Sequence, residues 1–559
     1  MKTFFRAFRP SLLALLASLP SAIFAMAGDS QDAVMRAMRD ELSRSMAQLQ
    51  LENLEKPYFI SYRVQDNRTQ SVAAQFGSAL GRNESLGRSV SVEVRVGSPA
   101  LDNTNFQAGG FGGGGGTLGA SLATDDNYDI LRRQLWLATD RAYKQAVELL
   151  SKKKAVLQNK TRTDVLPDFS PQPPTTITDL RPGKPIDLNQ AESLVRELSA
   201  LFRDAPGVAT SSVGLAAQEE TTRYINSESG TFVRSEFQIS FAASAATQAA
   251  DGFPLDDHYR AYARTWETLP PKAALIAAVR DVGRRLGAQR EASLLEQYNG
   301  PVLFEGQAAA EIFAQVFAPL LGARPRPVVE NSGRGGGRGG GPVENPFLDK
   351  LGARVLPDIF TVTDDATLTE IGGVPVFGDA RVDDEGVPTR SVALVEKGRL
   401  KTLLASRAPV RGVARSTGSL RGSNPVPSNL IVSVSDGLDA ATLKTELLKL
   451  IEQRGKDYGI IVRRLGNQGL RSAPVALAVK IFPDGREEPL RNIEVAGIDA
   501  PAFKDILVAG REPYLHTASF RGSMCTFAVP SLLFEDITLK KPAGEIGKPP
   551  IAKHPFFDR

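Results

Sequence analysis

The sequence is poor in cysteine and histidine, the residues that most often form cross-links or hold zinc. Its 559 residues include one cysteine, Cys525, and three histidines, His258, His516 and His554. One cysteine excludes an intramolecular disulfide and any cysteine-cluster metal site. A zinc hydrolase of the His-Glu type needs two imidazoles on one helix, and no histidine lies between positions 258 and 516. The composition therefore disfavours His-based zinc, Ser-His-Asp and Cys-His mechanisms.

A strong excess of charge is missing as well. The chain has 67 Lys+Arg and 63 Asp+Glu, a formal net charge of +4. Its 42% hydrophobic and 23% charged residues are typical of a globular protein rather than a disordered or fibrous one. A near-neutral surface gives no general electrostatic reason to bind nucleic acid. We therefore expect no nucleic-acid partner.

The first 27 residues resemble a targeting segment rather than part of the fold. The first nine carry three basic side chains, an apolar stretch follows over residues 12–19, and residues 25–27 read Ala-Met-Ala. This is the layout of a secretory signal peptide with a small-x-small cleavage site. A membrane anchor is the alternative, but Pro10 and Pro20 leave too short an apolar run for a bilayer of about 30 Å. We expect cleavage near Ala27 and a periplasmic or secreted mature chain without a membrane span.

Helical and strand periodicities alternate along the rest of the chain, which predicts an α+β, multi-domain fold. The apolar spacing predicts helices over residues 30–50, 126–153, 189–202, 272–288, 307–321 and 440–452. Ser30 is the candidate N-cap of the first helix, and the basic run Lys152-Lys153-Lys154 suits the C-terminal end of the second. Strands are predicted over residues 58–64, 89–96, 208–246 and 301–304, and most of 356–540 is predicted as strands and turns.

Short glycine-containing sequences mark the turns. Residues 224–233 are predicted as strand, turn and strand, and Lys397-Gly398 and Asp484-Gly485 as hairpin turns in a largely antiparallel C-terminal region. The glycine-rich tracts 109–116 and 332–341 are predicted as flexible surface loops. No Gly-Lys-Ser/Thr follows the first tract, which excludes a phosphate-binding P-loop.

These patterns divide the chain into five parts. We expect a signal peptide over 1–27, an N-terminal α+β domain over 28–123 and a central α+β domain over 124–295. A C-terminal β-rich domain with packed helices follows over 296–541, and 542–559 is a tail.

The remaining reactive side chains favour structural roles. Asp364-Asp365 and Asp383-Asp384-Glu385-Gly386 supply adjacent carboxylates, but acids beside glycine and proline usually form turns. No loop has the ligand spacing of an oxygen-ligated cation site. Cys525 follows His516 by nine residues, yet its neighbours are apolar, which favours a buried inert thiol over a nucleophile.

The C-terminal region resembles the TldD/PmbA (TldE) metalloprotease family over roughly residues 296–540. The Asp-Asp-Glu-Gly block and the hairpin after it carry the resemblance most specifically, and Asn226–Gly230 is similar to a turn of the family's earlier domains. The matching stretches are Pro301–Gln315, Gly352–Pro357, Asp383–Arg390, Val392–Lys401, Val529–Glu535 and Ile537–Leu539.

This resemblance implies a peptidase system of two related subunits, of which one carries zinc on a His-Glu-x-x-x-His helix. The alignment places Ala310, Glu311 and Gln315 at the motif, so both histidines are replaced and only Glu311 matches. The chain thus resembles the non-catalytic PmbA/TldE type, and Glu311 is expected to be a helix-surface residue. Cys525 lies near the position of the catalytic subunit's cysteine ligand. We expect no cofactor in this chain, and zinc in a partner.

Three hypotheses follow. The first is an exported, metal-free partner subunit that joins a zinc-bearing TldD-like paralogue and binds extended peptides by strand addition. The second is a metallopeptidase acting alone with an unusual ligand set, drawn from Glu311, Asp383 or Asp384, and Cys525. The third is a cell-envelope scaffold without a peptide-related role.

Overall fold

The computed structural model describes residues 32–108, 117–159, 166–205, 207–330, 345–466 and 473–542. Helices and two large sheets, of eight and twelve strands, share these ranges, which confirms the α+β prediction. The expected signal peptide, both glycine-rich tracts and nearly all of the expected tail lie outside the described residues. None of the helices within these ranges is long and apolar enough to cross a membrane.

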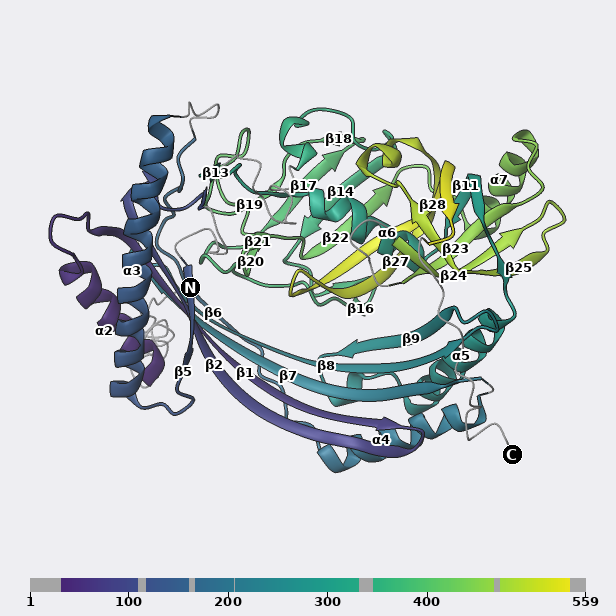
Figure 1. Ribbon diagram of the computed structural model, residues 1–559, viewed down its shortest axis with the longest axis horizontal. Helices are drawn as coiled ribbons and strands as arrows, with labels where there is room; N and C mark the ends of the chain where they lie inside the picture. Colours follow the sequence, from purple (N-terminus) through teal and green to yellow (C-terminus); the bar gives the residue numbers. More distant parts are fainter. Residues whose placement is uncertain are drawn as a thin grey trace, which may run out of the picture.

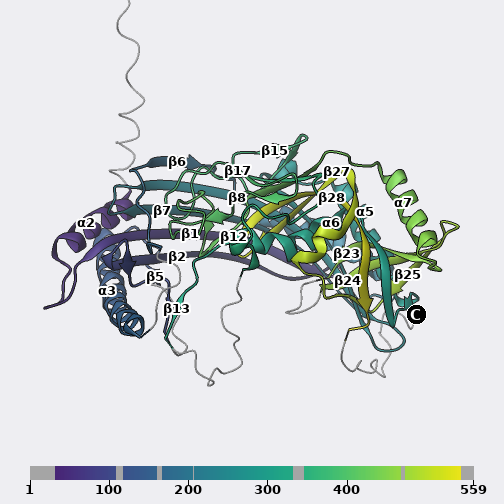
Figure 2. The same ribbon diagram turned by 90° about the horizontal axis from the view of Figure 1, so that it is seen from above.

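The N-terminal half forms one strongly curved sheet whose concave face is turned toward the C-terminal domain (Figure 1). Its strand order is β3-β2-β1-β7-β8-β6, with β5 on β2 and β9 on β8, and Figure 2 shows the order from β6 across to β2. Strands from the expected units 28–123 and 124–295 thus share a single sheet. The strands are β1 Pro57–Gln75, β2 Ser78–Ser98, β3 Leu101–Asp102, β5 Thr117–Leu122, β6 Thr176–Leu180, β7 Thr210–Asn226, β8 Thr231–Gln248 and β9 Pro254–Ala263.

Four helices pack on the convex face of this sheet and build two separate cores. Helices α2 (Ala33–Gln48) and α3 (Tyr128–Gln158) cover one end, whereas α4 (Leu188–Ala200) and α5 (Lys272–Arg290) cover the other. Along β1, Tyr62 belongs to the first core and Val72 to the second. Because side chains alternate between the faces of a strand, the odd-numbered residues of β1 face the concave side.

Two local details differ from the sequence-based predictions. Asp32 caps α2, since its carboxylate accepts hydrogen bonds from the N–H groups of Val34 and Met35, and Ser30 lies outside the described residues. The basic run 152–154 does not end its helix, and only the middle lysine of the run is buried. Lys153 is fully buried, and its Nζ lies 2.6 Å from Oδ2 of Asp168. Helix α3 continues past it to Gln158, and the buried carboxylate of Asp168 satisfies the ammonium group.

The C-terminal domain is a twelve-stranded, mostly antiparallel sheet in the order β10-β25-β24-β23-β11-β28-β22-β14-β17-β18, with β26 and β27 beside β28. Parallel pairs are confined to β10·β25, β11·β23 and β22·β28 within this sheet. The strands are β10 Ser293–Leu294, β11 Gln297–Phe304, β14 Phe360–Asp365, β17 Ser391–Glu396, β18 Arg399–Leu400, β22 Asn429–Val434, β23 Gly459–Leu465, β24 Ala473–Ile481, β25 Glu487–Arg491, β26 Ile493–Ala496, β27 Ile506–Phe520 and β28 Ser523–Lys540.

Smaller elements complete the chain. Lys397 and Gly398 both have positive φ and join β17 to β18, which confirms the predicted hairpin. Helix α7 (Ala440–Gln453) forms as predicted, but the helix expected over 307–321 is interrupted: α6 (Gln307–Ile312) passes into a π turn and then a 3-10 turn. The two-residue strand pairs are β4 Phe106–Gln107 with β13 Val328–Val329, β12 Gly322–Ala323 with β19 Leu404–Ala405, β15 Glu370–Ile371 with β16 Val374–Pro375, and β20 Leu420–Arg421 with β21 Asn424–Pro425.

Buried charges attach the C-terminal domain to one end of the concave face. Asp384 accepts hydrogen bonds from Nη1 of Arg63 at 2.8 Å and from Nη2 of Arg234 at 3.0 Å. Burial alone would raise the pKa of Asp384, but the charges of Arg63 and Arg234 outweigh it and lower that pKa to about 2. Tyr224 stacks on Phe232 beside these ion pairs, with ring centroids 5.1 Å apart. We call this region, centred on Asp384, the closed end of the concave face.

Candidate functional site

The site expected from the sequence lies on α6, and the structure changes the role of its glutamate. Glu311 is only 7% exposed, so the prediction that it lies on the helix surface is wrong. Its Oε1 accepts a hydrogen bond from Nε2 of Gln307 at 2.8 Å, and its Oε2 accepts one from the N–H of Leu465 at 2.6 Å. Burial raises the pKa of Glu311 to about 7. Glu311 therefore ties α6 to the end of β23.

The other two motif positions offer no metal ligand of the family's kind. Ala310 is fully buried in the C-terminal core, and Gln315 lies half-buried on the π turn that follows α6. Neither side chain carries an imidazole. With both oxygens of Glu311 already accepting protein hydrogen bonds, the residues present here do not fit a zinc ion. No reaction step through a metal can be derived at this position.

Strand β27 contributes two aromatic side chains beside α6. The Oη of Tyr514 lies 3.5 Å from Oε1 of Gln307, and burial, together with the charge of Glu311, raises the pKa of Tyr514. Burial lowers the pKa of His516 to about 4, and the charges of Arg260 and His258 act in the same direction. Burial lowers the pKa of His258 as well, so both imidazoles are neutral near pH 7.

An arginine on β23 fastens the curved sheet to this site. Nη1 of Arg464 donates to the carbonyl oxygen of His258 at 2.7 Å, and its guanidinium forms an ion pair with the fully buried Asp257. Asp257 also accepts a hydrogen bond from Nε of Arg285 on α5, at 2.7 Å. Since Leu465 is the next residue along β23, the contacts of Glu311 and Arg464 hold α6, β23 and β9 together at one point.

One edge of β27 is open to pairing. Its residues 513–520 are hydrogen-bonded to β28 on one side, and no strand of the described ranges pairs with them on the other. Figure 1 places β27 on the side of the C-terminal domain that faces the curved sheet, next to α6. Tyr514 remains 42% exposed there. The unpaired N–H and C=O groups can receive an extended chain as an additional strand.

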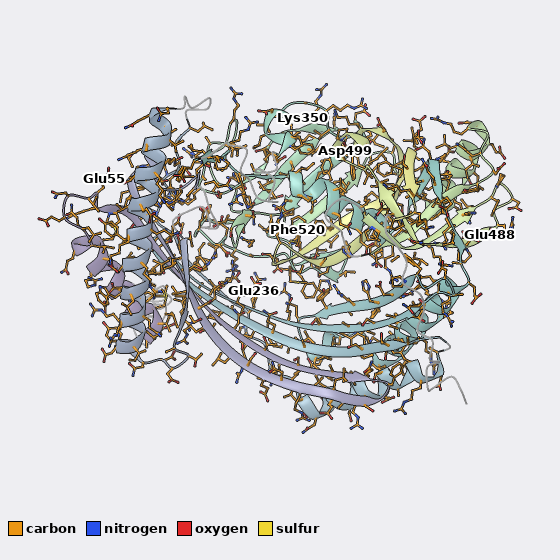
Figure 3. The ribbon with its side chains drawn as sticks, in the orientation of Figure 1. Glu55, Glu236, Lys350, Glu488, Asp499 and Phe520 are labelled. Carbon is orange, nitrogen blue, oxygen red and sulfur yellow. The ribbon has the colours of Figure 1, made fainter. Side chains whose placement is uncertain are left out.

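A pocket of about 450 Å³ lies on the concave face, at the end away from Asp384. Three small residues form one row of its floor across adjacent strands, Ala73 on β1, Gly214 on β7 and Ala242 on β8. Ser71, Ala216 and Ser240 form the next row, and residues 80–83 of β2 border it. We call this region the open end of the concave face. Figure 3 shows Glu236 on the concave side of the sheet, between the two ends, with Phe520 of β27 across from it.

The remaining sequence-derived candidates lie elsewhere and have partners of their own. Cys525 is fully buried, its Sγ donates to the carbonyl oxygen of Pro427 at 2.9 Å, and burial raises the pKa of the thiol, which makes it a poor nucleophile. Asp383 accepts from the N–H groups of Glu385 and Val387 and forms a turn. Burial raises the pKa of both Asp383 and Glu385.

The four candidate ligands are thus not gathered into one site. Asp383 and Asp384 are neighbours, but Glu311 and Cys525 each contact different segments. Across the described ranges, no group of three or more His, Cys, Asp or Glu side chains has an arrangement that could hold a metal ion.

Sequence reasoning missed the residues that join the two domains. Arg464 lies 206 residues from His258, and Arg63 lies 321 residues from Asp384. In the sequence, each of these arginines looks like an ordinary polar residue of a half-buried strand. No local pattern indicates that an arginine is buried, because its partner comes from another domain. A weak signal was present at Tyr514 and His516, which alternate along a strand beside Pro513.

Comparisons with known proteins agree on one family. Residues 297–541 match the family described as PmbA/TldA metallopeptidase C-terminal domain. A metalloprotease of Methanocaldococcus jannaschii is 44% identical over 64 residues, which are 11% of this chain and only 13% of that relative.

Solved structures with the same fold cover nearly the whole chain. A protein described as a modulator of a DNA gyrase, from Thermotoga maritima, has a TM-score of 0.58 at 15% identity, covering 86% of this chain and 96% of its own. A similarly described protein from Bacteroides thetaiotaomicron has a TM-score of 0.56 at 12% identity, covering 91% and 98%. TldE from Thermococcus kodakarensis has a TM-score of 0.54 at 14% identity, covering 91% and 99%. At these identities the likeness concerns the fold alone.

Proposed function

This chain belongs to the TldD/PmbA family, and from that premise we propose that it is a metal-free subunit of a zinc peptidase. In this proposal it joins a zinc-bearing TldD-like paralogue, holds extended peptides and leaves the cleavage to its partner. The relation to peptidases rests on the C-terminal domain over residues 297–541 and on the metalloprotease relative.

The observation that carries the proposal is that both carboxylate oxygens of Glu311 accept hydrogen bonds from the protein. A glutamate serves a zinc peptidase as the base that activates a metal-bound water. Here its two oxygens accept hydrogen bonds from Gln307 and Leu465, and the flanking motif positions are Ala310 and Gln315. The carboxyl group therefore supports the helix–strand junction rather than a reaction.

Peptide binding is supported by two features that face the same space. The edge of β27 at residues 513–520 offers unpaired backbone groups, which recognise an extended chain with little sequence preference. The small residues of the open end leave room for side chains that project from such a strand. A bound peptide would thus be held between the two domains, beside Tyr514.

The cellular setting is also part of the proposal. The basic, apolar and small-residue order of the first 27 residues supports export, with a cut near Ala27. The zinc-bearing partner must then be exported too, and a neighbouring gene for a similar protein with an intact His-Glu-x-x-x-His helix is expected.

The test is to mix the mature chain with that paralogue and to follow both complex formation and cleavage of an unstructured peptide. We expect a stable complex, and faster cleavage in the mixture than with the paralogue alone. A matched peptide with N-methylated amides at alternate residues should be cleaved more slowly, because methylation removes the donors that pair with a strand edge.

Other outcomes would assign a different role. If no complex forms and cleavage is unchanged, the subunit proposal is wrong. One zinc ion per chain after dialysis, together with cleavage by the isolated chain, would support the metallopeptidase acting alone. The absence of peptide binding in every assay would favour the envelope scaffold.

A further inference from the structure

The outer edge of β2 is exposed over half its length. Residues 78–87 are all exposed, and within the described part of the chain they pair only with β1, because β5 reaches β2 no further than Arg88. Figure 2 shows β2 at the outer side of the curved sheet. Leu80 and Leu86 are 59% and 57% exposed on this segment. A long edge with unpaired backbone groups and exposed leucines is suited to pairing with another strand.

The segment's charges are arranged symmetrically about Asn83. Arg82 and Glu84 flank it, and both lie on the convex face, since they oppose Val72 and Gln70 of β1. Within the chain Arg82 also pairs with Glu192 of α4, and Glu84 accepts a hydrogen bond from Gln70, so a second copy would share these exposed charges. In an antiparallel pair of two identical strands centred on Asn83, Arg82 of each copy lies opposite Glu84 of the other. Centring the pair on Arg82, Glu84 or Ser85 instead places like charges opposite each other: two arginines, two glutamates, or Arg82 against Arg88.

Edges that are protected from pairing are usually short, covered or bulged, or carry proline, lysine or other charged side chains. Residues 78–87 contain no proline or lysine, and their two charges are opposite in sign. The register shift between Ala73 and Ala74 on β1 falls opposite Leu80 and interrupts the regular pairing there. The self-complementary part is therefore the segment 81–85.

We propose that the β2 edge is a docking surface for a second copy of this chain, in which residues 81–85 of the two copies pair antiparallel about a twofold axis at Asn83. Such a pairing is isologous and closed, so it gives a dimer rather than a filament. It does not depend on the peptidase role and leaves the α6–β27 site free.

The pairing would also extend the open end of the concave face. Gly81, Arg82 and Asn83 border the pocket of about 450 Å³ on the β2 side. Because the twofold axis passes beside these residues, the pockets of the two copies become neighbours on one continuous sheet. An extended ligand could then cross from one copy to the other.

A single introduced cysteine tests the register. In the predicted pair, the Cα atoms of Asn83 and its symmetry mate are about 4.5–5.5 Å apart, which suits a disulfide. We expect Asn83→Cys to form a covalent dimer under mild oxidation. Native Cys525 is fully buried and should not compete.

The matched control is Ser85→Cys, on the same exposed edge. Its two copies would be four residues apart along the strands, about 13 Å, and beyond the reach of a disulfide. We expect no cross-link with this variant. Equal cross-linking of both variants, or of neither, would overturn the proposed pairing.

A charge exchange tests the same surface without a cross-link. In light scattering at micromolar protein, the unmodified chain should have twice the monomer mass. Arg82→Glu or Glu84→Arg alone should lower the mass to that of the monomer, because each change creates two pairs of like charges across the axis. The double variant should recover the dimer. A monomeric unmodified chain would contradict the proposal, as would a dimer unaffected by either single change.

Discussion

The concave face of the curved sheet is closed at one end and open at the other, although β1, β7 and β8 run through both. At the closed end these strands present Arg63, Tyr224 and Arg234, which are covered by the loop around Asp384. At the open end the two rows of these strands that form the pocket floor carry Ser, Ala and Gly, and a pocket remains.

This difference shows why the C-terminal domain contacts one end of the curved sheet and not the other. A guanidinium leaves water only when a carboxylate and further acceptors replace its hydration. Arg63 and Arg234 can therefore be covered only by a segment that brings Asp384 to them. The small side chains of the open end need no charged partner. No particular segment of the C-terminal domain is therefore required to cover them, and the surface stays available for a ligand.

The largest expected effect comes from removing the carboxylate of the closed end. Asp384→Ala leaves two buried guanidinium groups without their partner, which should lower the free energy of unfolding by about 3–5 kcal/mol. Urea unfolding followed by tryptophan fluorescence and circular dichroism measures this loss. Because the pKa of Asp384 is lowered to about 2, its contribution is complete above about pH 4 and is lost as the pH falls toward 2.

Glu236→Ala is the matched control for this comparison. Glu236 lies 3.3 Å from Nε of the same Arg234, but its side chain is 39% exposed. An exposed pair of this kind contributes about 0–1 kcal/mol. Equal losses for Asp384→Ala and Glu236→Ala would show that burial of the ion pair is not what holds the closed end.

A smaller effect is expected at Glu311, within the C-terminal domain. Its pKa is raised to about 7, so the folded state retains a proton that the unfolded chain loses near pH 4.5. Stability should therefore fall as the pH rises from about 4.5 to 7, by an amount on the order of 1–3 kcal/mol. Glu311→Gln keeps an acceptor for Leu465 and should remove this part of the pH dependence. Thermal unfolding of both proteins at pH 5 and pH 8 measures it, and parallel shifts would contradict the assignment.

The smallest effect on stability is expected at the open end. Ala242→Leu places a larger side chain on an exposed floor position and should change stability by no more than about 0.5 kcal/mol. It should nevertheless weaken peptide binding several-fold, because it occupies the pocket. Ser244→Leu lies on the same face and strand but outside the pocket lining and should leave binding unchanged. Fluorescence anisotropy with a labelled peptide distinguishes the two, and equal affinities would remove the pocket from the proposed site.

Local periodicity was enough to predict most elements of the fold. Leu131, Leu135 and Ala138 repeat at helical spacing and are fully buried along α3. The turn Lys397-Gly398 was predictable for a similar reason, since its conformation depends on the two residues themselves. The curvature of the sheet and its span across two expected units were not predictable, because register over long strands depends on contacts between distant segments.

The candidate site, too, could be predicted from the sequence only where local patterns determine it. The sequence located α6 and the missing imidazoles, but it placed Glu311 on the surface. The burial of Glu311 depends on the N–H of Leu465, 154 residues further along the chain. The burial of Lys153 could not be predicted for the same reason, since its carboxylate partner Asp168 and the carbonyl acceptors at Asp102 and Thr104 are brought together only by the fold.

The ion pair between Arg63 and Asp384 also bears on the order in which the molecule assembles during synthesis. The two residues are separated by 321 positions. At rates of 5–20 residues per second, roughly 15–60 s separate the synthesis, or the passage through an export channel at a similar rate, of Arg63 and of its partner. Until the second half of the chain has arrived, the inner surface of the sheet carries cations without their carboxylate, so the second half docks late in folding.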